Sequence, residues 1–455
     1  MSSGRPQIRR LACFFALTGL LVALAFPAGS GVAAEGGEPQ AVAPLPGPDI
    51  AAEMPTARRG SPAASTRRVK QGGLARKLGN LIDQAGSGSG VYVADTEKGK
   101  VFERRADSSR ILASNTKLFT TATALEVIGP KERLRTRVVA DGEVKRKGVL
   151  RGDLYLVGDG DPALAGRSYA RRKGIPGTPL GRLAAQVKKA GVKKVTGRLY
   201  ADDSVFDGVR GVPDSGGNTS EYIGPLSGLS YNENHGDGGF VSNPETNTAE
   251  VLRRGLKNRG IKIGKVSEAR APAGLLEDDP IADARSATIT QLIAETNKPS
   301  NNFFAEMLLK RLDAADGDQG TTKGGTKEVE RFAKSVGSGV NAADGSGLTR
   351  TNRATPEQVG KLLVAMSDGN DSRAFKTSLP KAGKEGTLAG RMNGTAAEGR
   401  CRAKTGTISG VSALSGYCRA RGTELAFSIL MNGVNTTSAR NIQDKMAATI
   451  ARYKP

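Results

Sequence analysis

The sequence of 455 residues contains one histidine, no tryptophan and three cysteines. The single histidine, His235, excludes a zinc site built on two or three imidazoles. A Ser-His-Asp triad would have to use this residue, but it lies in the glycine-rich loop "NENHGDGG", and no Gly-x-Ser-x-Gly turn supplies a serine. A Gly-x-x-x-x-Gly-Lys-Ser/Thr phosphate loop is also missing. These absences disfavour histidine-based hydrolases, zinc enzymes and P-loop nucleotide enzymes.

Long apolar runs are scarce too, and the one that is present lies near the start of the chain. Arginines precede "LACFFALTGLLVALAFPA", and the small residues Val32 and Ala34 follow it. This order predicts a secretory signal peptide, residues 1–34, cleaved near Ala34. The alternative is an uncleaved membrane anchor, because the run is nearly long enough to span a bilayer. Residues 35–72, rich in Pro and Ala without periodicity, predict a disordered tether. We therefore expect an exported protein of the cell wall or the outer face of the membrane.

Only two cysteines, Cys401 and Cys418, remain once the leader is removed. An even number in an exported chain favours a disulfide. The sequence between them predicts two strands around "ISGV". If Ser409 and Gly410 form a two-residue turn, the cysteines lie directly opposite each other, at a separation that a disulfide can bridge. The alternative is a pair of unrelated buried thiols.

Acidic residues are too few to balance the basic ones, and the formal net charge is +22. Nucleic-acid binding is the usual interpretation of such a charge. Predicted export, the absence of tryptophan and the lack of a basic helix interleaved with aromatics argue against it. An anionic cell wall or membrane surface is a better partner for an exported basic protein. The alternative is that the charge serves only solubility.

Hydrophobic periodicity divides the rest of the chain into an interrupted domain and an insert. Alternation in "GVYVADTEKGKVFERRA" and near the C-terminus predicts strands at both ends, and helical periodicity lies between them. We assign residues 73–140 and 271–455 to one domain of helices packed on a sheet. Residues 141–270 contain short strand-like runs with many Gly and Asp, which predicts an inserted β-rich domain.

With histidine almost absent, a serine with a lysine base remains as a source of nucleophilic chemistry. In "ASNTKLF", Ser114 and Lys117 are three residues apart at the start of a predicted helix, so their side chains share one face. The alternative is a serine cap followed by a solvated lysine. A second copy of the motif, Ser378 and Lys381, contains Pro380, so we expect a loop there and no aligned pair.

Two further motifs carry groups that such a pair would need. Lys404-Thr405-Gly406 lies on a predicted strand before a turn. Its lysine would supply a second cation, its threonine could bind a carboxylate, and its glycine would let a substrate backbone approach. Ser300 and Asn302 form a Ser-x-Asn motif between two predicted helices. Each motif is common by itself, whereas the three in this order are specific.

The three motifs and their flanks resemble one family of penicillin-binding proteins. The segments "ASNTKLFTTATALEVIGP", "GPLSGLSYNEN", "KPSNNFFAEMLLK", "DGSGLTRTNRATPEQ" and "RAKTGTISGVSALSGY" are similar to the D-alanyl-D-alanine carboxypeptidase/endopeptidase family, the class C low-molecular-mass penicillin-binding proteins of peptidase family S13. The resemblance covers residues from about 75 to 455. It implies an α+β, penicillin-recognising serine-transferase (β-lactamase-like) fold, with helices packed on an antiparallel sheet built from both chain ends.

The resemblance also implies a mechanism on peptidoglycan stem peptides. Ser114 would attack the carbonyl of the penultimate D-alanine, with Lys117 as its base and Lys404 helping to keep that base neutral. Ser300 and Lys404 would pass the proton to the leaving D-alanine. Asn302 would hold Lys117 and the substrate amide.

Binding of the substrate's end is implied for the strand motif. Thr405 and Thr407 would bind the terminal carboxylate beside Gly406, and the backbone N–H groups of Ser114 and Thr407 would form an oxyanion hole. β-Lactams should acylate Ser114, and neither a metal ion nor an organic cofactor is needed.

The chain departs from the family in two places, and other functions remain open. Asn301 stands where the family usually has aspartate, and the insert is shorter than usual, with room for one domain. A β-lactamase or esterase on the same fold is the nearest alternative function. A non-catalytic wall-binding protein, which would use the basic surface and the tether, is the alternative from another class.

Overall fold

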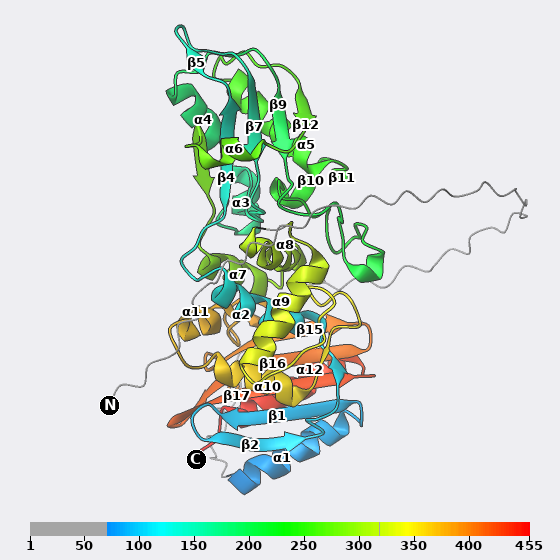
Figure 1. The fold of residues 1–455 in the computed structure, drawn as a ribbon. Helices are drawn as coiled ribbons and strands as arrows, with labels where there is room; N and C mark the ends of the chain where they lie inside the picture. The colour runs from blue at the N-terminus through cyan, green and yellow to red at the C-terminus, as the bar shows by residue number, and fades with distance from the viewer. Residues whose placement is uncertain (1–70, 318) are drawn as a thin grey trace, which may run out of the picture. The chain divides into compact units, whose positions relative to one another are not determined.

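The computed structural model describes residues 71–317 and 319–455 (Figure 1). The predicted signal peptide, residues 1–34, and the predicted tether up to residue 70 lie outside the described residues. Within the described part of the chain, no helix is both long enough and apolar enough to cross a membrane.

A five-stranded antiparallel sheet joins the two ends of the described chain. Its order is β15-β16-β17-β1-β2. The strands are β1 (Ser89–Asp95), β2 (Gly99–Arg104), β15 (Cys401–Ile408), β16 (Val411–Ala420) and β17 (Thr423–Asn432). The central strands β1 and β17 are almost wholly buried, because helices cover both faces of the sheet. Both chain ends therefore build one sheet, as predicted.

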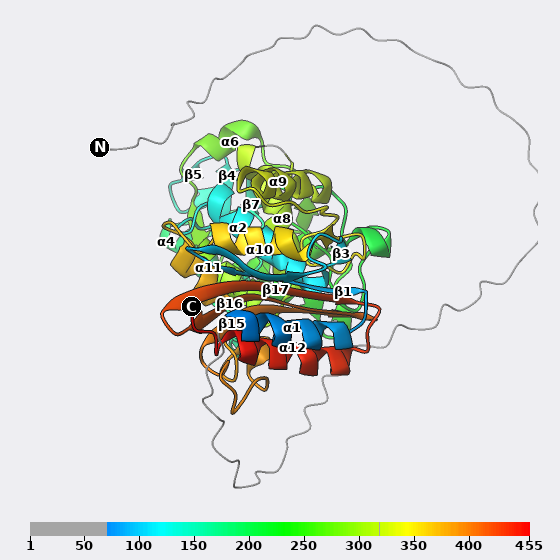
Figure 2. The ribbon, with the colours of Figure 1, turned by 90° about the horizontal axis from the view of Figure 1, so that it is seen from below.

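One face of the sheet packs against the first and last helices, which lie side by side in Figure 2. These are α1 (Gln71–Gln84) and α12 (Thr436–Ile450). Leu74, Leu78 and Ile82 project from α1 at helical spacing, and all three are fully buried in the core against the sheet. The helix thus begins two residues before the predicted start of the folded domain.

The opposite face of the sheet carries the helices that position the candidate site. They are α2 (Thr116–Val127), α7 (Ile289–Asn297), α8 (Asn302–Asp313), α9 (Thr322–Ser335), α10 (Pro356–Ala365) and α11 (Ser372–Ser378). Helix α2 is buried along almost its whole length, and its apolar residues share one core with α7, α8 and the sheet. A helix enclosed on all sides can hold polar side chains away from water, which matters for the site.

The chain between α2 and α7 forms a second sheet, with strand order β12-β9-β7-β4-β13. Its strands are β4 (Arg135–Asp141), β7 (Asp153–Val157), β9 (Leu199–Asp202), β12 (Val266–Glu268) and β13 (Ala282–Arg285). Helices α4 (Gly181–Lys189) and α5 (Pro244–Lys257) pack on it through a separate core. The insert is thus a mixed α and β unit, with more helix than the β-rich prediction.

Shorter elements complete the described chain. They are β3 (Arg110–Ile111), β5 (Val144–Lys145), β6 (Val149–Leu150), α3 (Arg167–Lys173), β8 (Lys194–Val195), β10 (His235–Gly236), β11 (Gly239–Phe240), α6 (Ala273–Glu277) and β14 (Arg353–Ala354). The sheet of the insert extends from Arg135 to Arg285, beyond the predicted limits of 141 and 270. We propose these strands as the limits of the inserted domain.

A disulfide joins Cys401 and Cys418 across β15 and β16. The register pairs Ile408 with Val411 around a two-residue turn and places the cysteines opposite each other, as the spacing predicts. Both cysteines are buried in the core beneath α12. The cross-link therefore ties the beginning of the Lys404 strand to its neighbour.

Replacing both cysteines by serine should lower the free energy of unfolding by about 3 kcal/mol. The disulfide closes a loop with a sequence separation of 17, and its loss gives that loop back its freedom in the unfolded chain. Urea unfolding of the oxidised protein, the reduced protein and the double variant measures the effect. The free energy of unfolding of the reduced protein should be lowered by about as much as that of the double variant. Equal stability of all three would contradict a structural role.

Candidate active site

Ser114 lies in a 3-10 turn, Ala113–Asn115, that leads into α2. The residue before it, Ala113, has φ +46°, a left-handed conformation that is costly for a residue with a side chain. Gly347 packs against this turn so closely that a Cβ there would lie 1.9 Å from the Ala113 carbonyl oxygen. The serine side chain caps neither helix. The structure thus excludes capping as the role of this serine.

The Lys117 side chain is fully buried one turn further along α2. Its Nζ lies 3.0 Å from Ser114 Oγ, 2.7 Å from Asn302 Oδ1 and 2.6 Å from the Ser346 carbonyl oxygen. A neutral amine has two N–H donors and one lone pair. It can donate to Asn302 and Ser346, which accept only, and receive the Ser114 hydroxyl proton on its lone pair. The geometry is therefore that of a base aimed at a hydroxyl.

Burial makes the neutral form of Lys117 accessible near neutral pH. The loss of hydration lowers its pKa from 10.5 to about 7. The carboxylates of Asp344 and, more weakly, Glu306 oppose this shift. These two acids are themselves fully buried, and burial together with their mutual repulsion raises the pKa of Glu306 to about 8. Burial is nevertheless the largest of these effects, so the pKa of Lys117 falls although both acids lie near it.

Ser300 lies in the connection between α7 and α8, as predicted, and Asn302 is the first residue of α8. Ser300 has φ +64°, a second left-handed residue, and its Oγ accepts from Lys404 Nζ at 2.8 Å. Asn302 opens α8 and directs its Oδ1 to Lys117, while its Nδ2 donates to the Tyr222 carbonyl of the insert at 3.3 Å. Two strained residues, Ala113 and Ser300, thus hold the two hydroxyls of the site.

Lys404 is also fully buried, in the middle of β15. Burial first, and the charge of Lys117 second, lower its pKa well below the ordinary value. The sequence analysis assigned to Lys404 the task of keeping Lys117 neutral. In the structure burial is the main cause for both lysines, and Lys404 adds a hydrogen bond to Ser300.

The remaining residues of the strand motif line its outer part. Thr405 Oγ1 donates to Thr387 Oγ1 at 2.8 Å, and Thr407, which is exposed, accepts from the Arg440 guanidinium at 3.3 Å. At Gly406, an added Cβ would lie 2.9 Å from the Leu112 carbonyl oxygen and 3.2 Å from the Asn115 backbone nitrogen. The side of this glycine that a Cβ would occupy is thus filled by the turn that carries Ser114. Packing against this turn is thus one reason for a glycine here, and the approach of a substrate backbone stays a prediction.

Four residues of the site were missed by the sequence analysis. They are Glu306, Asp344, Ser346 and Arg440. The first three lie in the segments "NNFFAEMLLK" and "DGSG", which were noted only as family flanks. An acid in an otherwise apolar helical run is a signal of buried charge that could have singled out Glu306. Arg440 is exposed on α12, and no local pattern distinguishes it from other arginines.

The second copy of the motif does not form a site. Ser378 is the last residue of α11, not part of a loop, and it is buried with its hydroxyl bound to the Phe375 carbonyl and the Asn297 amide. Lys381 lies beyond Pro380 and forms a backbone bridge with Arg402. His235 packs its ring against Phe240, with centroids 4.5 Å apart. The described residues hold no group of three or more His, Cys, Asp or Glu suited to a metal ion.

Asn301, the residue that differs from the family pattern, performs two structural tasks. Its Oδ1 caps α8 by accepting from the Phe304 backbone at 3.0 Å, and its Nδ2 donates to Glu233 Oε1 at 3.0 Å. Burial raises the pKa of Glu233, whereas the amide of Asn301 lowers it. An asparagine therefore suits this position because it can both accept and donate.

Replacing Asn301 by alanine should lower the free energy of unfolding by about 1 kcal/mol through loss of the cap. The loss should be larger at pH 8 than at pH 5, because the Glu233 carboxylate is then charged without its donor. Asn301→Asp is the matched control, since it keeps the cap but repels the carboxylate. Its loss of stability relative to the wild type should grow as the pH rises from 5 to 8, because the repulsion grows as Glu233 ionises. Denaturant unfolding at both pH values measures this, and a pH-independent loss would contradict the pairing.

Comparison with known proteins identifies relatives along almost the whole described chain. Residues 74–238 and 237–453 match the model of the D-Ala-D-Ala carboxypeptidase 3 (S13) family. A "D-alanyl-D-alanine carboxypeptidase" of Actinomadura sp. (strain R39) is 32% identical over 452 residues, which cover 81% of this chain and 82% of the relative. A "Carboxypeptidase DacB" of Mycolicibacterium smegmatis is 27% identical over 450 residues, which cover 90% of both chains.

A solved structure shares the fold. Penicillin binding protein 4 of Haemophilus influenzae aligns with a TM-score of 0.69 at 20% identity, over 83% of this chain and 99% of that one. A structure of the same protein in complex with a β-lactam aligns with a TM-score of 0.67. The α+β fold of penicillin-recognising enzymes predicted from the motifs is thereby confirmed.

Proposed function

Because this chain belongs to the D-Ala-D-Ala carboxypeptidase 3 (S13) family, we propose that it is an exported serine-type D-Ala-D-Ala carboxypeptidase acting on peptidoglycan stem peptides. The observation that carries this proposal is the placement of Ser114 Oγ 3.0 Å from the buried amine of Lys117. Membership of the family alone would leave open whether the nucleophile and its base are in place. The short contact between the Ser114 hydroxyl and the Lys117 amine supports these two roles, and burial lowers the pKa of Lys117 to about 7.

In the acylation step, Lys117 accepts the hydroxyl proton while Ser114 Oγ attacks the carbonyl carbon of the penultimate D-alanine. The backbone N–H groups of Ser114 and Thr407 stabilise the oxyanion that forms. The bond to the terminal D-alanine then breaks, and its nitrogen takes a proton through Ser300, whose hydroxyl is held by Lys404. The products are an ester on Ser114 and free D-alanine.

Recognition of the substrate's end involves the exposed part of β15. Thr405 and Thr407 bind the terminal carboxylate in this proposal, and Arg440, which donates to Thr407, adds a positive charge beside it. Asn302 holds Lys117 through its Oδ1 and orients the substrate amide. Water then attacks the ester and releases the shortened peptide with its new carboxylate.

The same steps extend to two other acyl donors. A cross-linked stem peptide would lose a second peptide's amine in place of D-alanine, which makes the reaction an endopeptidase reaction. A β-lactam would acylate Ser114 as its ring opens. Its amine remains attached to the acyl group, and we expect the adduct to leave slowly.

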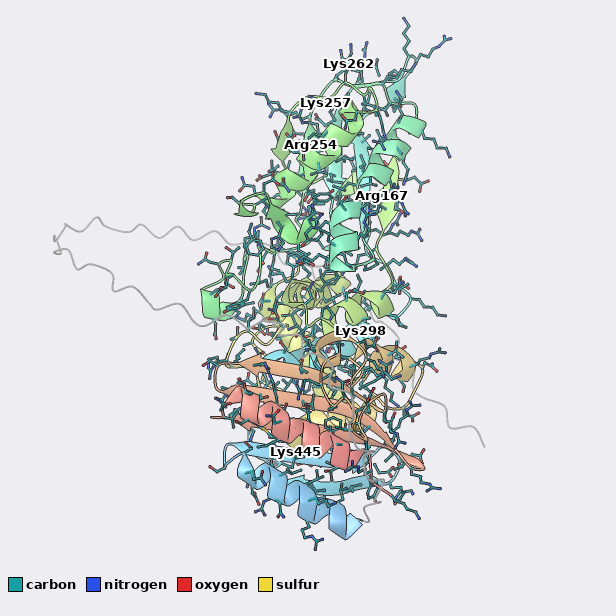
Figure 3. All side chains as sticks on the ribbon, turned by 180° about the vertical axis from the view of Figure 1, so that it is seen from behind. Arg167, Arg254, Lys257, Lys262, Lys298 and Lys445 are labelled. Atoms are coloured by element: carbon teal, nitrogen blue, oxygen red, sulfur yellow. A yellow bond between two sulfur atoms is a disulfide. The ribbon has the colours of Figure 1, made fainter. Side chains whose placement is uncertain are left out.

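An anionic cell wall or membrane surface is the partner that we propose for the basic surface. Residues 162–201 contain ten Lys or Arg and no acid, and residues 251–267 contain six and no acid. The two segments meet where Lys194 and Lys262 form an isolated backbone bridge. Figure 3 labels Arg254 and Lys257 on α5 close to Lys262. Like charges side by side favour an anionic partner.

Two measurements on the mature protein test the proposed activity. Incubation with a pentapeptide ending in D-Ala-D-Ala should release one equivalent of D-alanine per peptide. Incubation with benzylpenicillin should increase the protein mass by the mass of the penicillin. Rapid hydrolysis of penicillin without a stable adduct would favour a β-lactamase instead. The absence of both reactions would favour a non-catalytic wall-binding protein.

A further inference from the structure

A polar cavity away from Ser114 lies on the active-site face of the main sheet. Its volume is about 300 Å³, and five cationic side chains and one acid line it: Lys376, Lys381, Arg400, Arg402, Arg419 and Glu424. The ring of Tyr417 contributes to its wall. None of these residues has a part in the proposed mechanism.

The strand register explains why the cations converge. Lys381, Arg402 and Tyr417 lie opposite one another across three neighbouring segments. Arg419 lies opposite Glu424, and its backbone N–H donates to the Arg400 carbonyl. Arg400 directly precedes β15, and it lines the same cavity as Arg402. The cluster therefore follows from pairing within the sheet.

The charges of this cluster are not balanced by the protein. Glu424 pairs with Lys376, and Glu385 pairs with Arg402 at 2.7 Å. Arg419 reaches only the Gly399 carbonyl, at 3.5 Å. Lys381 and Arg400 have no side-chain hydrogen bond or ion pair among residues 71–317 and 319–455. Three of the five cations, Lys381, Arg400 and Arg419, thus face the cavity without an ion pair of their own in the described chain, although their mutual repulsion disfavours this arrangement.

We propose that this cavity binds an oxyanion of the phosphate class. Arginine guanidinium groups bind phosphate oxygens in a bidentate manner, and lysine adds a further charge. A cavity lined by charges of one sign also concentrates the opposite ion. The Cys401–Cys418 disulfide joins the residues next to Arg400 and Arg419, and so holds the backbones of the two arginines close together. Free phosphate and a phosphate group of a wall polymer present the same chemistry to this site.

The site lies next to the catalytic groups in sequence but does not include them. Arg402 precedes Lys404 by two residues on β15, and Ser114 is not among the residues that line the cavity. Anion binding and acylation can therefore be measured separately. If the protein does not bind the anion, the proposed acylation is unaffected, and if it is not acylated, the proposed anion site is unaffected.

Isothermal titration of the full mature protein with inorganic phosphate and with diphosphate, at low ionic strength, tests the proposal. We expect saturable binding of one anion, tighter for diphosphate. The double variant Arg400→Gln/Arg419→Gln should bind at least about tenfold more weakly, because it loses two charge-assisted contacts. Arg421→Gln is the matched control, since this arginine lies in the same hairpin but does not line the cavity. It should bind like the wild type.

Three further measurements make the outcome decisive. If the double variant does not fold, the single variant Lys381→Gln replaces it in the test. It should also bind the anion more weakly than the wild type. Penicillin acylation should be unchanged in every variant, which shows that the active site is intact. Long-chain polyphosphate is compared with inorganic phosphate. If the polymer has the higher affinity per phosphate group, the natural ligand is a phosphate group of a polymer and not free phosphate. No saturable binding to the wild type, or equal binding by the double variant, would overturn the proposal.

Discussion

Replacing Ser114 by alanine should abolish the penicillin adduct and lower D-alanine release by at least about 10⁴-fold. The reason is that the acyl-enzyme has no other oxygen on which to form, and removal of a nucleophile costs most of the rate that a catalytic unit supplies. Intact-protein mass spectrometry with benzylpenicillin and a D-alanine assay with pentapeptide measure both effects. The fold should be unaffected, because the Ser114 side chain caps no helix.

The chain offers a matched control for this variant in its second Ser-x-x-Lys copy. Ser378→Ala removes a buried hydroxyl bound to the Phe375 carbonyl and the Asn297 amide. It should lose some stability but still form the adduct at the wild-type level. An adduct on the Ser114→Ala protein, or its loss only in the Ser378→Ala protein, would contradict the assignment of the nucleophile.

The acylation rate should rise about tenfold per pH unit below pH 7 and level off above it. Lys117 acts as a base only when it is deprotonated, and burial places its pKa at about 7. Lys117→Met should lower the acylation rate about 10²- to 10⁴-fold and abolish this pH dependence. Stopped-flow measurement with a fluorescent penicillin, between pH 5 and 9, gives both quantities.

Two variants show whether the pH dependence belongs to Lys117. Lys381→Met, the lysine of the second copy, should leave the profile unchanged. Asp344→Asn removes the charge that opposes deprotonation, so the Lys117 pKa should fall and the rise should move to lower pH. The role of Lys117 as the base would be contradicted if the acylation rate of both Lys117→Met and Asp344→Asn still rose up to pH 7 and levelled off above it, as in the wild type.

Much of the candidate site could be predicted because its parts are local in sequence. A separation of three residues on a helix places Lys117 beneath Ser114 whatever surrounds them. The spacing of Cys401 and Cys418 about a two-residue turn defines a strand register, and the structure has that register. The limits of the inserted domain were predicted less well, because the residues that define them are far apart in sequence. Strands β4 and β13, for example, pair directly although the rest of the insert separates them. The roles of the site residues themselves remain predictions.

The sequence by itself determined the family, the α+β fold and the three motifs, because these depend on residue identity, order and spacing. Only the tertiary structure decided the protonation behaviour of the site. Lys117, Lys404, Glu306 and Asp344 come from separate segments and are all fully buried. Burial removes the water that would stabilise the charged forms, and the extent of burial depends on the whole fold. A lysine with a pKa near 7 is thus a property of the packed molecule, although the serine that it serves is three residues away.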